Sequence, residues 1–279
     1  MKASVLDTLT VPLSPPSAGT LVTLTLNRPE SGNALNRELI DSLTTAFKEI
    51  AKTECRAVIL TGRGRHFCTG ADLGWMQAAQ KLTKSENHED AARFEKMLAA
   101  YAMLPMPTLA IVRGSAYGGA LGLLAASDIV LATAGAKFSL SEVRLGLFPA
   151  MILRYLQKRV APGPLTRLAL TARVVDAEFA REIGLVHVVA SDNDIQAAAT
   201  DELNLLLAGA PHAQSRFKSL ARDLSALAFS DRQAIQESRT AIAEARTGSE
   251  GQAGLKSFFD KSPPPWRGAI PKDWKIPWD

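Results

Sequence analysis

The chain has 279 residues, of which 47% are hydrophobic and 22% charged, so it can bury a substantial core and does not have the composition of a disordered protein. Its only cysteines, Cys55 and Cys68, do not make a disulfide framework, an iron–sulfur cluster or a cysteine zinc site. The formal net charge of +4 is too small and too scattered to define a nucleic-acid-binding stripe. These features favour a protein of one or two domains, without a metal site, in a reducing cytoplasm.

The N-terminal segment 1–19 is interrupted by acidic residues, hydroxyl groups and prolines, so it lacks the apolar stretch of a secretory signal. The longest apolar candidate, 116–126, is much shorter than the roughly 20 residues that cross a bilayer. It is rich in glycine and alanine, which predicts close packing against neighbouring elements. We therefore expect neither a secretory leader nor a membrane span.

Short apolar runs and amphipathic segments alternate through the first half of the chain. Residues 21–26 alternate apolar side chains with threonine, which predicts a half-buried strand. Residues 33–52 place apolar side chains at three- and four-residue spacing, which predicts a helix, and the run 57–61 predicts a buried strand. The alternation is typical of an α/β protein. It continues with a helix over 86–103, a strand over 108–113, a turn over 114–119, a helix over 120–127 and a strand over 128–133.

After Pro149 the pattern becomes mostly helical, with one strand-like interruption at 186–189. The segment 262–279 holds five of the 15 prolines and three of the four tryptophans, which predicts an extended tail. Large indoles are costly to leave in water, so we expect the tail to dock on a surface or on a neighbouring subunit. The tryptophans are Trp266, Trp274 and Trp278. The amphipathic helices of this part are predicted over 194–207, 213–228 and 231–246.

The first segment with chemical potential, His66–Leu73, follows a predicted strand. Gly70 permits an unusual backbone angle, so the next amides can point into a cleft as hydrogen-bond donors. The segment equally fits an ordinary strand-to-helix turn in which Asp72 caps the helix. His66 and Cys68 complete neither a catalytic triad nor a metal-ligand set, and a buried cysteine is usually inert.

A second glycine-rich segment, Gly114–Gly122, lies between a predicted strand and a predicted helix. Its glycines let the backbone approach a ligand, and the helix N-terminus adds partial positive charge. The spacing fits neither the GxGxxG of dinucleotide sites nor the GxxxxGK[ST] of phosphate loops. This segment and the first glycine turn can each donate one amide hydrogen bond to a single shared oxygen, as in an oxyanion hole for a thioester enolate.

The third segment, Phe138–Ala150, places Glu142 among apolar and small residues. A carboxylate in such surroundings is either paired structurally or tuned for proton transfer. Arg144, two residues further on, is the expected salt-bridge partner. Spacing alone slightly favours this structural pair.

Taken together, the order and spacing of these blocks resemble the enoyl-CoA hydratase/isomerase, or crotonase, superfamily over about residues 20–262. The resemblance implies a spiral of repeated β-β-α units with a C-terminal helical trimerisation region, in a homotrimer or a hexamer made of two trimers. We accordingly expect a core over 1–200, a trimerisation region over 201–262 and a Pro/Trp-rich tail over 263–279. The matching blocks are 26–29, 33–36, 57–62, 67–73, 114–120, 127–129 and 141–146.

The resemblance also implies the ligand and the site. The substrate would be an acyl-CoA thioester, with coenzyme A as part of the substrate and no prosthetic group or metal. By position, the backbone amides of Ala71 and Gly119 would stabilise an enolate, and Glu142 would move protons. Contacts to the acyl group are expected from Tyr117 and Trp75. Contacts to coenzyme A are implied for Asn33, Ala34, Leu35, Asp72 and Leu73, and for Phe258 and Lys261 from an adjacent helix or subunit.

The chain departs from the family's standard hydratases at one position. Those enzymes have two catalytic glutamates, and the first corresponds here to Gly122. Isomerase, hydrolase or decarboxylase chemistry therefore stays open. Segments 70–76, 116–123 and 140–150 nevertheless resemble a bacterial branch that also has glycine there. That branch hydrates 3-methylglutaconyl-CoA in leucine breakdown or isohexenylglutaconyl-CoA in acyclic terpene breakdown.

Segment 151–156 departs from the methylglutaconyl type, which tilts the prediction towards the bulkier isohexenyl substrate. Glu142 alone would then activate water for attack at Cβ and return a proton to Cα. The free carboxylate of such a substrate needs a cation, for which Arg144 and Arg154 are candidates. The alternatives are an enoyl-CoA isomerase or acyl-CoA hydrolase of the same superfamily and, remotely, an RNA-binding protein.

Overall fold

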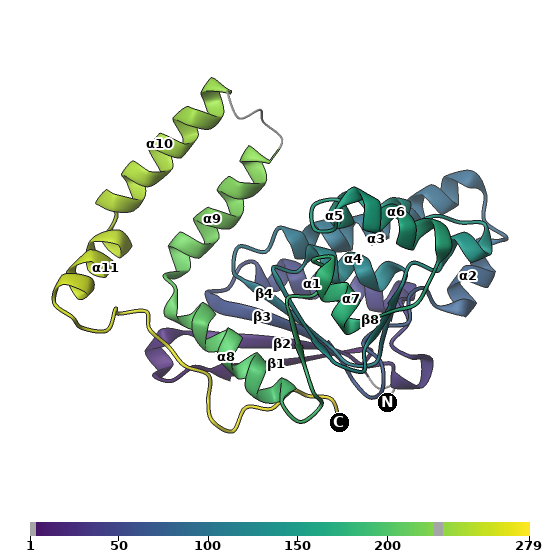
Figure 1. Cartoon of the computed structure of the whole chain (residues 1–279), viewed down its shortest axis with the longest axis horizontal. Coiled ribbons are helices and arrows are strands. Elements are labelled where there is room, and N and C mark those ends of the chain that lie inside the picture. The colour runs from purple at the N-terminus through teal and green to yellow at the C-terminus, as the bar shows by residue number, and fades with distance from the viewer. Residues whose placement is uncertain (1–3, 226–230) are drawn as a thin grey trace.

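A computed structural model gives the arrangement of the chain and describes residues 4–225 and 231–279 (Figure 1). The strands are β1 (Leu6–Pro12), β2 (Thr20–Leu26), β3 (Cys55–Gly62), β4 (Thr108–Val112), β5 (Ser115–Tyr117), β6 (Ile129–Thr133), β7 (Lys137–Ser139), β8 (Val175–Asp176) and β9 (Val188–Ala190). The α-helices up to the C-terminal third are α1 (Arg37–Ile50), α2 (Leu73–Ala79), α3 (Lys84–Ala102), α4 (Gly119–Ala126), α5 (Ala150–Leu156), α6 (Pro162–Thr171) and α7 (Ala177–Glu182). They are followed by α8 (Ile195–Ala208), α9 (Pro211–Leu224), α10 (Arg232–Thr247) and α11 (Ser249–Phe259). Short 3-10 segments are η1 (Pro16–Ala18), η2 (Pro29–Ser31) and η3 (Glu142–Leu145).

The larger sheet has six strands in the order β1-β2-β3-β4-β6-β9. The first pair is antiparallel and all later pairs are parallel, with helices in the connections between them. A smaller sheet pairs β5 with β7 and β7 with β8. This mixed architecture confirms the predicted α/β class.

Side chains of β3 show how the larger sheet divides the core. Val58 and Leu60 pack on the face covered by α1, α3 and α4, whereas Ala57 and Ile59 pack on the opposite face. Successive side chains alternate because the strand is pleated. The opposite face is covered by α8, through Leu203 and its neighbours on one helix stripe. A parallel sheet is normally covered on both faces, and in this chain helices cover both faces of the larger sheet.

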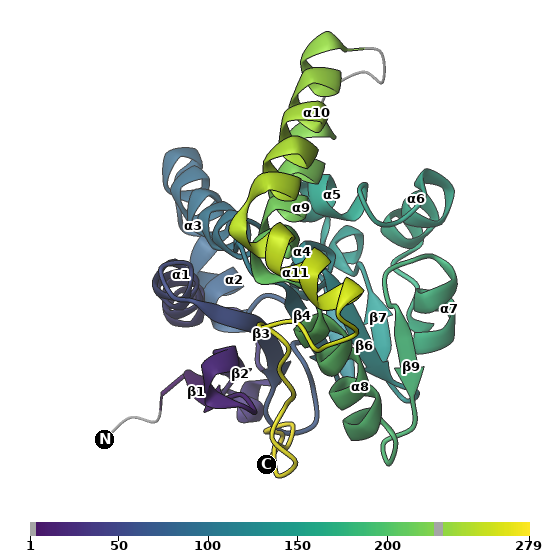
Figure 2. The ribbon, with the colours of Figure 1, turned by 90° about the vertical axis from the view of Figure 1, so that its left-hand side faces the viewer.

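The tail completes the cover of the second face (Figures 1 and 2). Trp274 is 5% exposed and packs with the side chains of α8 and the sheet. The buried guanidinium of Arg56 donates to the carbonyls of Trp266 and Gly209, each at 2.7 Å. The tail therefore docks on its own chain, with Trp274 buried against the sheet.

Helices α9, α10 and α11 extend away from the sheet as a helical arm (Figure 1). The predicted boundary at residue 200 falls inside α8, whose apolar stripe packs on the sheet. The arm begins at α9 instead. The helix predicted over 213–228 ends at Leu224 among the described residues, and 226–230 lie outside them. No helix in the described ranges is both long and apolar enough for a bilayer span.

The turn predicted over 114–119 is wrong in part, because residues 115–117 form β5. This strand pairs in parallel with β7 from Ser115 opposite Lys137 to Tyr117 opposite Ser139. Three residues are too few to show an alternating pattern, so only the pairing reveals the strand. The pairing matters for function because it fixes the backbone just before Gly119.

Candidate active site

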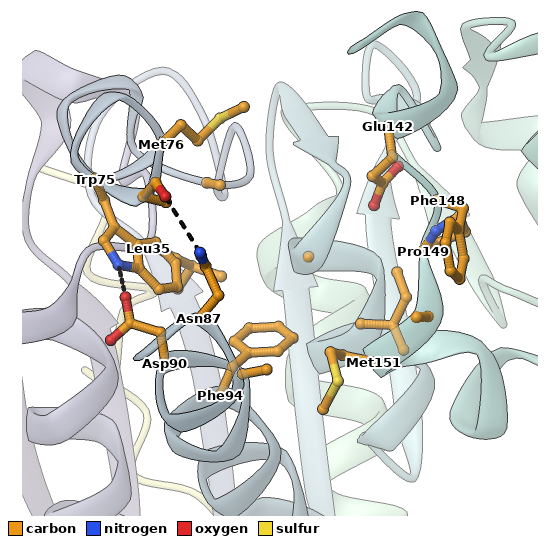
Figure 3. Close-up of a pocket in the computed structure, with 16 residues that line it drawn as sticks. Leu35, Trp75, Met76, Asn87, Asp90, Phe94, Glu142, Phe148, Pro149 and Met151 are labelled. Carbon is orange, nitrogen blue, oxygen red and sulfur yellow. Dashed lines mark hydrogen bonds between the residues drawn. The ribbon is translucent and has the colours of Figure 1, made fainter. Parts of the chain in front are cut away.

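Glu142 begins η3 and faces a cavity of about 290 Å³ (Figure 3). Apolar side chains from α2, α3 and the start of α5 form most of the cavity wall, with Trp75 and Phe94 on the side facing Glu142. Among the described residues that line the cavity, none is a lysine, arginine or histidine. The wall is made by Leu35, Ala71, Trp75, Met76, Ala79, Asn87, Asp90, Ala91, Phe94, Gly119, Glu142, Phe148, Pro149, Ala150, Met151 and Ile152.

Among the residues that the structure describes, none is a cationic partner of the Glu142 carboxylate. Its Oε2 atom is buried and makes no hydrogen bond to any residue of the described chain. The predicted pair with Arg144 is wrong, because the short η3 turn leaves the Arg144 side chain exposed. Burial raises the pKa of Glu142 above its ordinary value. A buried, unpaired carboxylate of this kind is suited to taking up and releasing a proton.

The backbone N–H groups of Ala71 and Gly119 both belong to the cavity wall, and neither has a protein acceptor within the described ranges. On either side of Ala71 the backbone is bonded, because Leu35 N–H donates to the Gly70 carbonyl at 2.7 Å and Asp72 N–H donates to the Leu35 carbonyl at 3.0 Å. Gly119 is the first residue of α4, where an N–H has no partner inside the helix. Both donors are therefore available to a ligand.

The segments that carry these amides are joined to each other. Cys68 N–H donates to the Ser115 carbonyl and Tyr117 N–H donates to the Cys68 carbonyl, both at 3.1 Å. Gly70 has φ +99°, and a side chain there would lie 2.9 Å from the Tyr117 carbonyl oxygen. Only glycine tolerates both the angle and the close approach. The close approach therefore supports the predicted role of this glycine.

The second glycine-rich segment brings Glu142 next to the amide of Gly119. Gly118 has φ +51°, and a Cβ atom at this position would lie 3.3 Å from Oε1 of Glu142. The unpaired carboxylate of Glu142 and the free amides of Ala71 and Gly119 thus line one apolar cavity, which is an arrangement that can stabilise an oxyanion and transfer a proton beside it.

Comparison with known proteins gives this arrangement a family. Residues 17–269 match the family described as enoyl-CoA hydratase/isomerase. The chain belongs to this family. Membership confirms the predicted crotonase fold and identifies an enzyme of the hydro-lyase type.

Individual relatives agree with this membership. The chain is 34% identical over 247 residues to an enoyl-CoA hydratase of Alternaria alternata, a match that covers 86% of this chain and 78% of that protein. It is 34% identical over 183 residues to the mitochondrial Delta(3,5)-Delta(2,4)-dienoyl-CoA isomerase of Mus musculus, covering 61% of this chain and 55% of the isomerase. The crystal structure of an enoyl-CoA hydratase from Shewanella pealeana superposes with a TM-score of 0.86 at 32% identity, over 94% of this chain and 96% of that chain.

Among the residues proposed for coenzyme A in this hydratase/isomerase chain, Leu35 lines the cavity and is almost fully buried. The Asn33 side chain is used within the protein instead. Its Oδ1 accepts from Arg28 N–H at 2.8 Å, and its Nδ2 donates to two carbonyls of the 62–72 segment. The Ala34 carbonyl accepts from the Arg28 guanidinium. Asn33 and Ala34 are thus bonded within the protein and do not line the cavity, and the Asn33 side chain is not free for a ligand.

Asp72 caps α2 by accepting from Trp75 N–H at 3.1 Å, and it pairs with Arg28 at 2.9 Å. Burial by itself would raise the pKa of Asp72, but its hydrogen bonds, with Arg28 foremost, lower it overall. Leu73 is 82% exposed and lies outside the cavity wall. The sequence leaves a cap and a ligand contact as alternatives for Asp72, and the structure shows the cap.

Of the remaining residues predicted to contact the substrate, some line the cavity and others lie outside it. Trp75 lines the cavity, and Tyr117 contributes its carbonyl beside Gly70 without lining it. Phe258 and Lys261 are exposed at the end of α11, which Figure 1 shows at the opposite end of the long axis from α2. They do not reach the cavity of their own chain. Arg154 is also outside the cavity wall, because its guanidinium binds Glu95 at 2.6 Å.

Asp90 is a cavity residue that the sequence does not single out. It is buried, accepts from Trp75 Nε1 at 2.9 Å and pairs with Arg37 at 2.7 Å (Figure 3). These bonds hold the Trp75 ring at the wall. Asp90 lies four residues before Phe94 on the buried face of α3, and a charged residue on an apolar helix face is the signal that points to it.

Gly122 has a packing reason. A Cβ atom at this position would lie 2.3 Å from Cγ2 of Ile152, closer than real Cβ contacts come. Ile152 on α5 therefore occupies the space that a side chain at residue 122 would need. Of the two carboxylates in the cavity wall, Asp90 is held by its partners and Glu142 is free of them.

The other nucleophile and ligand candidates are structural. Burial raises the pKa of Cys68 to about 12, so its thiol stays protonated at neutral pH. His66 Nδ1 accepts from Ser115 N–H at 3.1 Å, which ties the two glycine-rich segments together. Within the described ranges, His, Cys, Asp and Glu form no group of three that could hold a metal ion.

The raised pKa of Glu142 predicts the pH dependence of turnover. Only the ionised carboxylate can accept a proton from water, so kcat should rise with pH through the Glu142 pKa and its acidic limb should lie above pH 4.5, the ordinary value. The test is kcat measured at saturating substrate between pH 4 and 8. Saturation keeps the titration of the CoA phosphate, which has a pKa of about 6, from entering through binding. A kcat that stays level down to pH 4.5 would contradict the assignment.

Proposed function

We propose that this chain hydrates the conjugated double bond of an enoyl-CoA thioester with Glu142 as its single acid–base group. The observation that carries the proposal is the unpaired Glu142 carboxylate beside the free amides of Ala71 and Gly119 in one apolar cavity. A hydration that passes through an enolate needs both parts: donors for the oxyanion and one group that moves protons.

In the proposed reaction, the thioester oxygen accepts hydrogen bonds from the amides of Ala71 and Gly119, which draws electron density away from Cβ. Glu142 removes a proton from water as the oxygen adds to Cβ, and the electron pair of the double bond moves onto the thioester as an enolate. The protonated Glu142 then gives its proton to Cα. One carboxylate serves both steps if it lies within reach of both carbons.

The cavity wall supports a proposal for the acyl group. Apolar residues line the cavity from Met76 and Ala79 to Phe148 and Met151, which supports a substrate with a bulky apolar branch on Cβ. We therefore favour isohexenylglutaconyl-CoA over 3-methylglutaconyl-CoA. The described residues of the wall supply no cation for the free carboxylate, and Arg154 is held by Glu95. We therefore propose that this carboxylate lies at the cavity mouth, where Arg144 is the exposed candidate.

This substrate assignment predicts an order of rates. We expect kcat/KM to be highest for isohexenylglutaconyl-CoA, lower for 3-methylglutaconyl-CoA and lowest for crotonyl-CoA, because each step leaves more of the apolar wall in water, at about 25 cal/mol per Å². The measurement is the loss of the conjugated-enoyl ultraviolet band. Equal or faster turnover of crotonyl-CoA would overturn the branched-substrate assignment while leaving hydration intact.

The same reaction mixtures separate the alternative activities. Hydration yields a 3-hydroxyacyl-CoA, isomerisation leaves the mass unchanged, and hydrolysis releases a free thiol. The similarity to the mouse dienoyl-CoA isomerase favours isomerisation as the second candidate. Binding of RNA stays a remote alternative, and it would fall steeply with salt and persist beside excess CoA.

We further propose that the chain assembles as a homotrimer or as a hexamer of two trimers in the cytoplasm. Large apolar side chains on the helical arm support self-association, because isolated helices rarely leave so many in water. Phe258 and Lys261 would then meet a neighbouring subunit. The exposed apolar residues of the arm are Phe217, Ile235, Ile242, Leu255, Phe258 and Phe259.

A further inference from the structure

We propose that Trp278, in the tail, is a positioning residue for the oxyanion donors. The inference rests on the proposed function, because it concerns the two segments that carry the amides of Ala71 and Gly119. The first segment runs from the end of β3 at 61–62 to 72, and the second runs from 113, directly after β4, to 119. Trp278 contacts both segments where they leave the large sheet, and it lies outside the cavity wall. Its influence on the reaction would therefore pass through the backbone.

Trp278 makes two hydrogen bonds at the start of the first segment. Its indole Nε1 donates to the Thr61 hydroxyl at 2.9 Å, and its carbonyl accepts from Gly64 N–H at 2.7 Å. Thr61 lies at the end of β3, and Gly64 opens the segment that leads to Ala71. Gly64 has φ +76°, so this bond holds a turn that few other residues can form.

The Trp278 ring also meets the second segment. The guanidinium of Arg113 lies over the ring, 5.1 Å from its centroid, which is cation–π geometry. Arg113 directly follows β4, and its carbonyl accepts from Phe67 N–H of the first segment at 2.8 Å. One residue, through its side chain and its carbonyl, thus contacts both segments near the bond between Phe67 and Arg113 that joins them.

Further hydrogen bonds hold the two segments between this place and the donors. Asn33 Nδ2 donates to the carbonyls of Arg63 and His66, at 2.9 and 2.7 Å. His66 Nδ1 in turn accepts from Ser115 N–H at 3.1 Å. Displacement at the start of either segment is therefore passed on to the amide at its end. Oxyanion stabilisation depends steeply on donor position, so small displacements lower the rate.

Trp278 is itself held at a fixed place by the tail before it. Trp274 is buried against the sheet, and its carbonyl accepts from Gln196 Nε2 at 3.2 Å. Ile276 N–H donates to Oε1 of the same glutamine at 2.9 Å. The indole of Trp278 is partly buried against the same cluster. These contacts make the tail a strap anchored on α8 that ends at the two segments.

The experiment compares Trp278→Ala with Trp266→Ala in the full-length protein. Trp266 is also a tail tryptophan, but its Nε1 donates to the Ala208 carbonyl and its ring packs on Gly254 of α11. Using the enoyl-CoA that the wild type turns over fastest, we expect Trp278→Ala to lower kcat about tenfold with KM changed less than about twofold. Trp266→Ala should change kcat by less than about twofold, whatever it does to thermal stability.

Two conservative variants separate positioning from folding. Trp278→Phe keeps a ring for Arg113 and the main-chain bond to Gly64 but loses the indole donor, so its kcat should lie between those of the wild type and the alanine variant. Thr61→Val removes the acceptor of the same bond together with the bond that the Thr61 hydroxyl donates to the Ile111 carbonyl at 2.9 Å, so its kcat should be no higher than that of Trp278→Phe. If the alanine variant fails to fold, this matched pair still decides the question, because wild-type kcat in both would overturn the role.

A spectroscopic readout reports the oxyanion donors directly. Acetoacetyl-CoA is a 3-ketoacyl thioester whose enolate has its own ultraviolet band, so the bound enolate fraction measures the two amides without turnover. Trp278→Ala should reduce this fraction and Trp266→Ala should not. Equal reductions in kcat and in the enolate band for both variants would overturn the inference. A wild type that hydrates none of the three enoyl-CoA thioesters would instead overturn the proposed function.

Discussion

Glu142→Gln is expected to lower kcat for hydration by about a thousandfold, within the range of 10²–10⁴ that positioned acid–base groups supply. The amide has the shape of the carboxylate but cannot accept a proton from water, and no second free carboxylate lines the cavity among the described residues. The measurement is the rate at which the conjugated-enoyl band disappears.

The fold should survive this change, which makes the result interpretable. Oε2 of Glu142 has no hydrogen-bond partner in the described chain, so the substitution breaks no protein contact at this atom. Glu95→Gln is the matched control, because Glu95 pairs with Arg154 outside the cavity and should keep kcat within about twofold. Near-wild-type hydration by Glu142→Gln would contradict the proposed mechanism.

Gly122→Glu is expected to destabilise the protein by about 3 kcal/mol or more without raising kcat. The new Cβ would overlap Cγ2 of Ile152 and lie 3.3 Å from Cδ1 of Leu98, and the carboxylate would start from a buried turn of α4. Overpacking costs about 1–3 kcal/mol, and a buried unpaired carboxylate adds to that. Leaving glycine removes a helix penalty of only about 1 kcal/mol, so the clash decides the sign.

The measurement is thermal unfolding, in which each kcal/mol shifts Tm by about 2–4 °C in chains of somewhat smaller size. Gly135→Glu is the matched control, because a side chain at Gly135 meets nothing within 4 Å and should change stability by less than about 0.5 kcal/mol. Ile152→Ala tests the cause. It is itself destabilising, but the double variant Gly122→Glu with Ile152→Ala should be more stable than the sum of the two single changes by at least about 1 kcal/mol. Strict additivity would show that Ile152 is not what excludes a side chain at residue 122.

Much of the frame of this protein is set by local sequence pattern. Apolar periodicity places α1 and α3 to within a few residues, and β-branched runs place β3 and β4, because burial on one face leaves a 3.6- or 2-residue period. The glycines at 70 and 118 and the apolar surroundings of Glu142 are equally visible, since each is a local demand of backbone angle or burial.

The tertiary structure alone decides which partner each polar group takes. Arg144 is close to Glu142 in sequence but is turned out by η3, whereas Asn33 reaches the carbonyls of Arg63 and His66, about thirty positions away. Asp90 holds Trp75 across the gap between α3 and α2. Hydrogen bonds depend on distances of tenths of an ångström, which no residue spacing encodes for side chains on different elements.

The sequence by itself determined the α/β alternation, the glycine-rich segments, the candidate carboxylate and a tail rich in tryptophan. Only the packing of α5 on α4 shows why residue 122 is glycine, since the obstacle is Ile152 from another helix. Only the folded chain shows that the tail crosses the sheet and ends at Thr61 and Gly64. The physical reason is the same in each case: local patterns follow from burial and backbone angles, whereas contacts between distant segments depend on how whole elements pack.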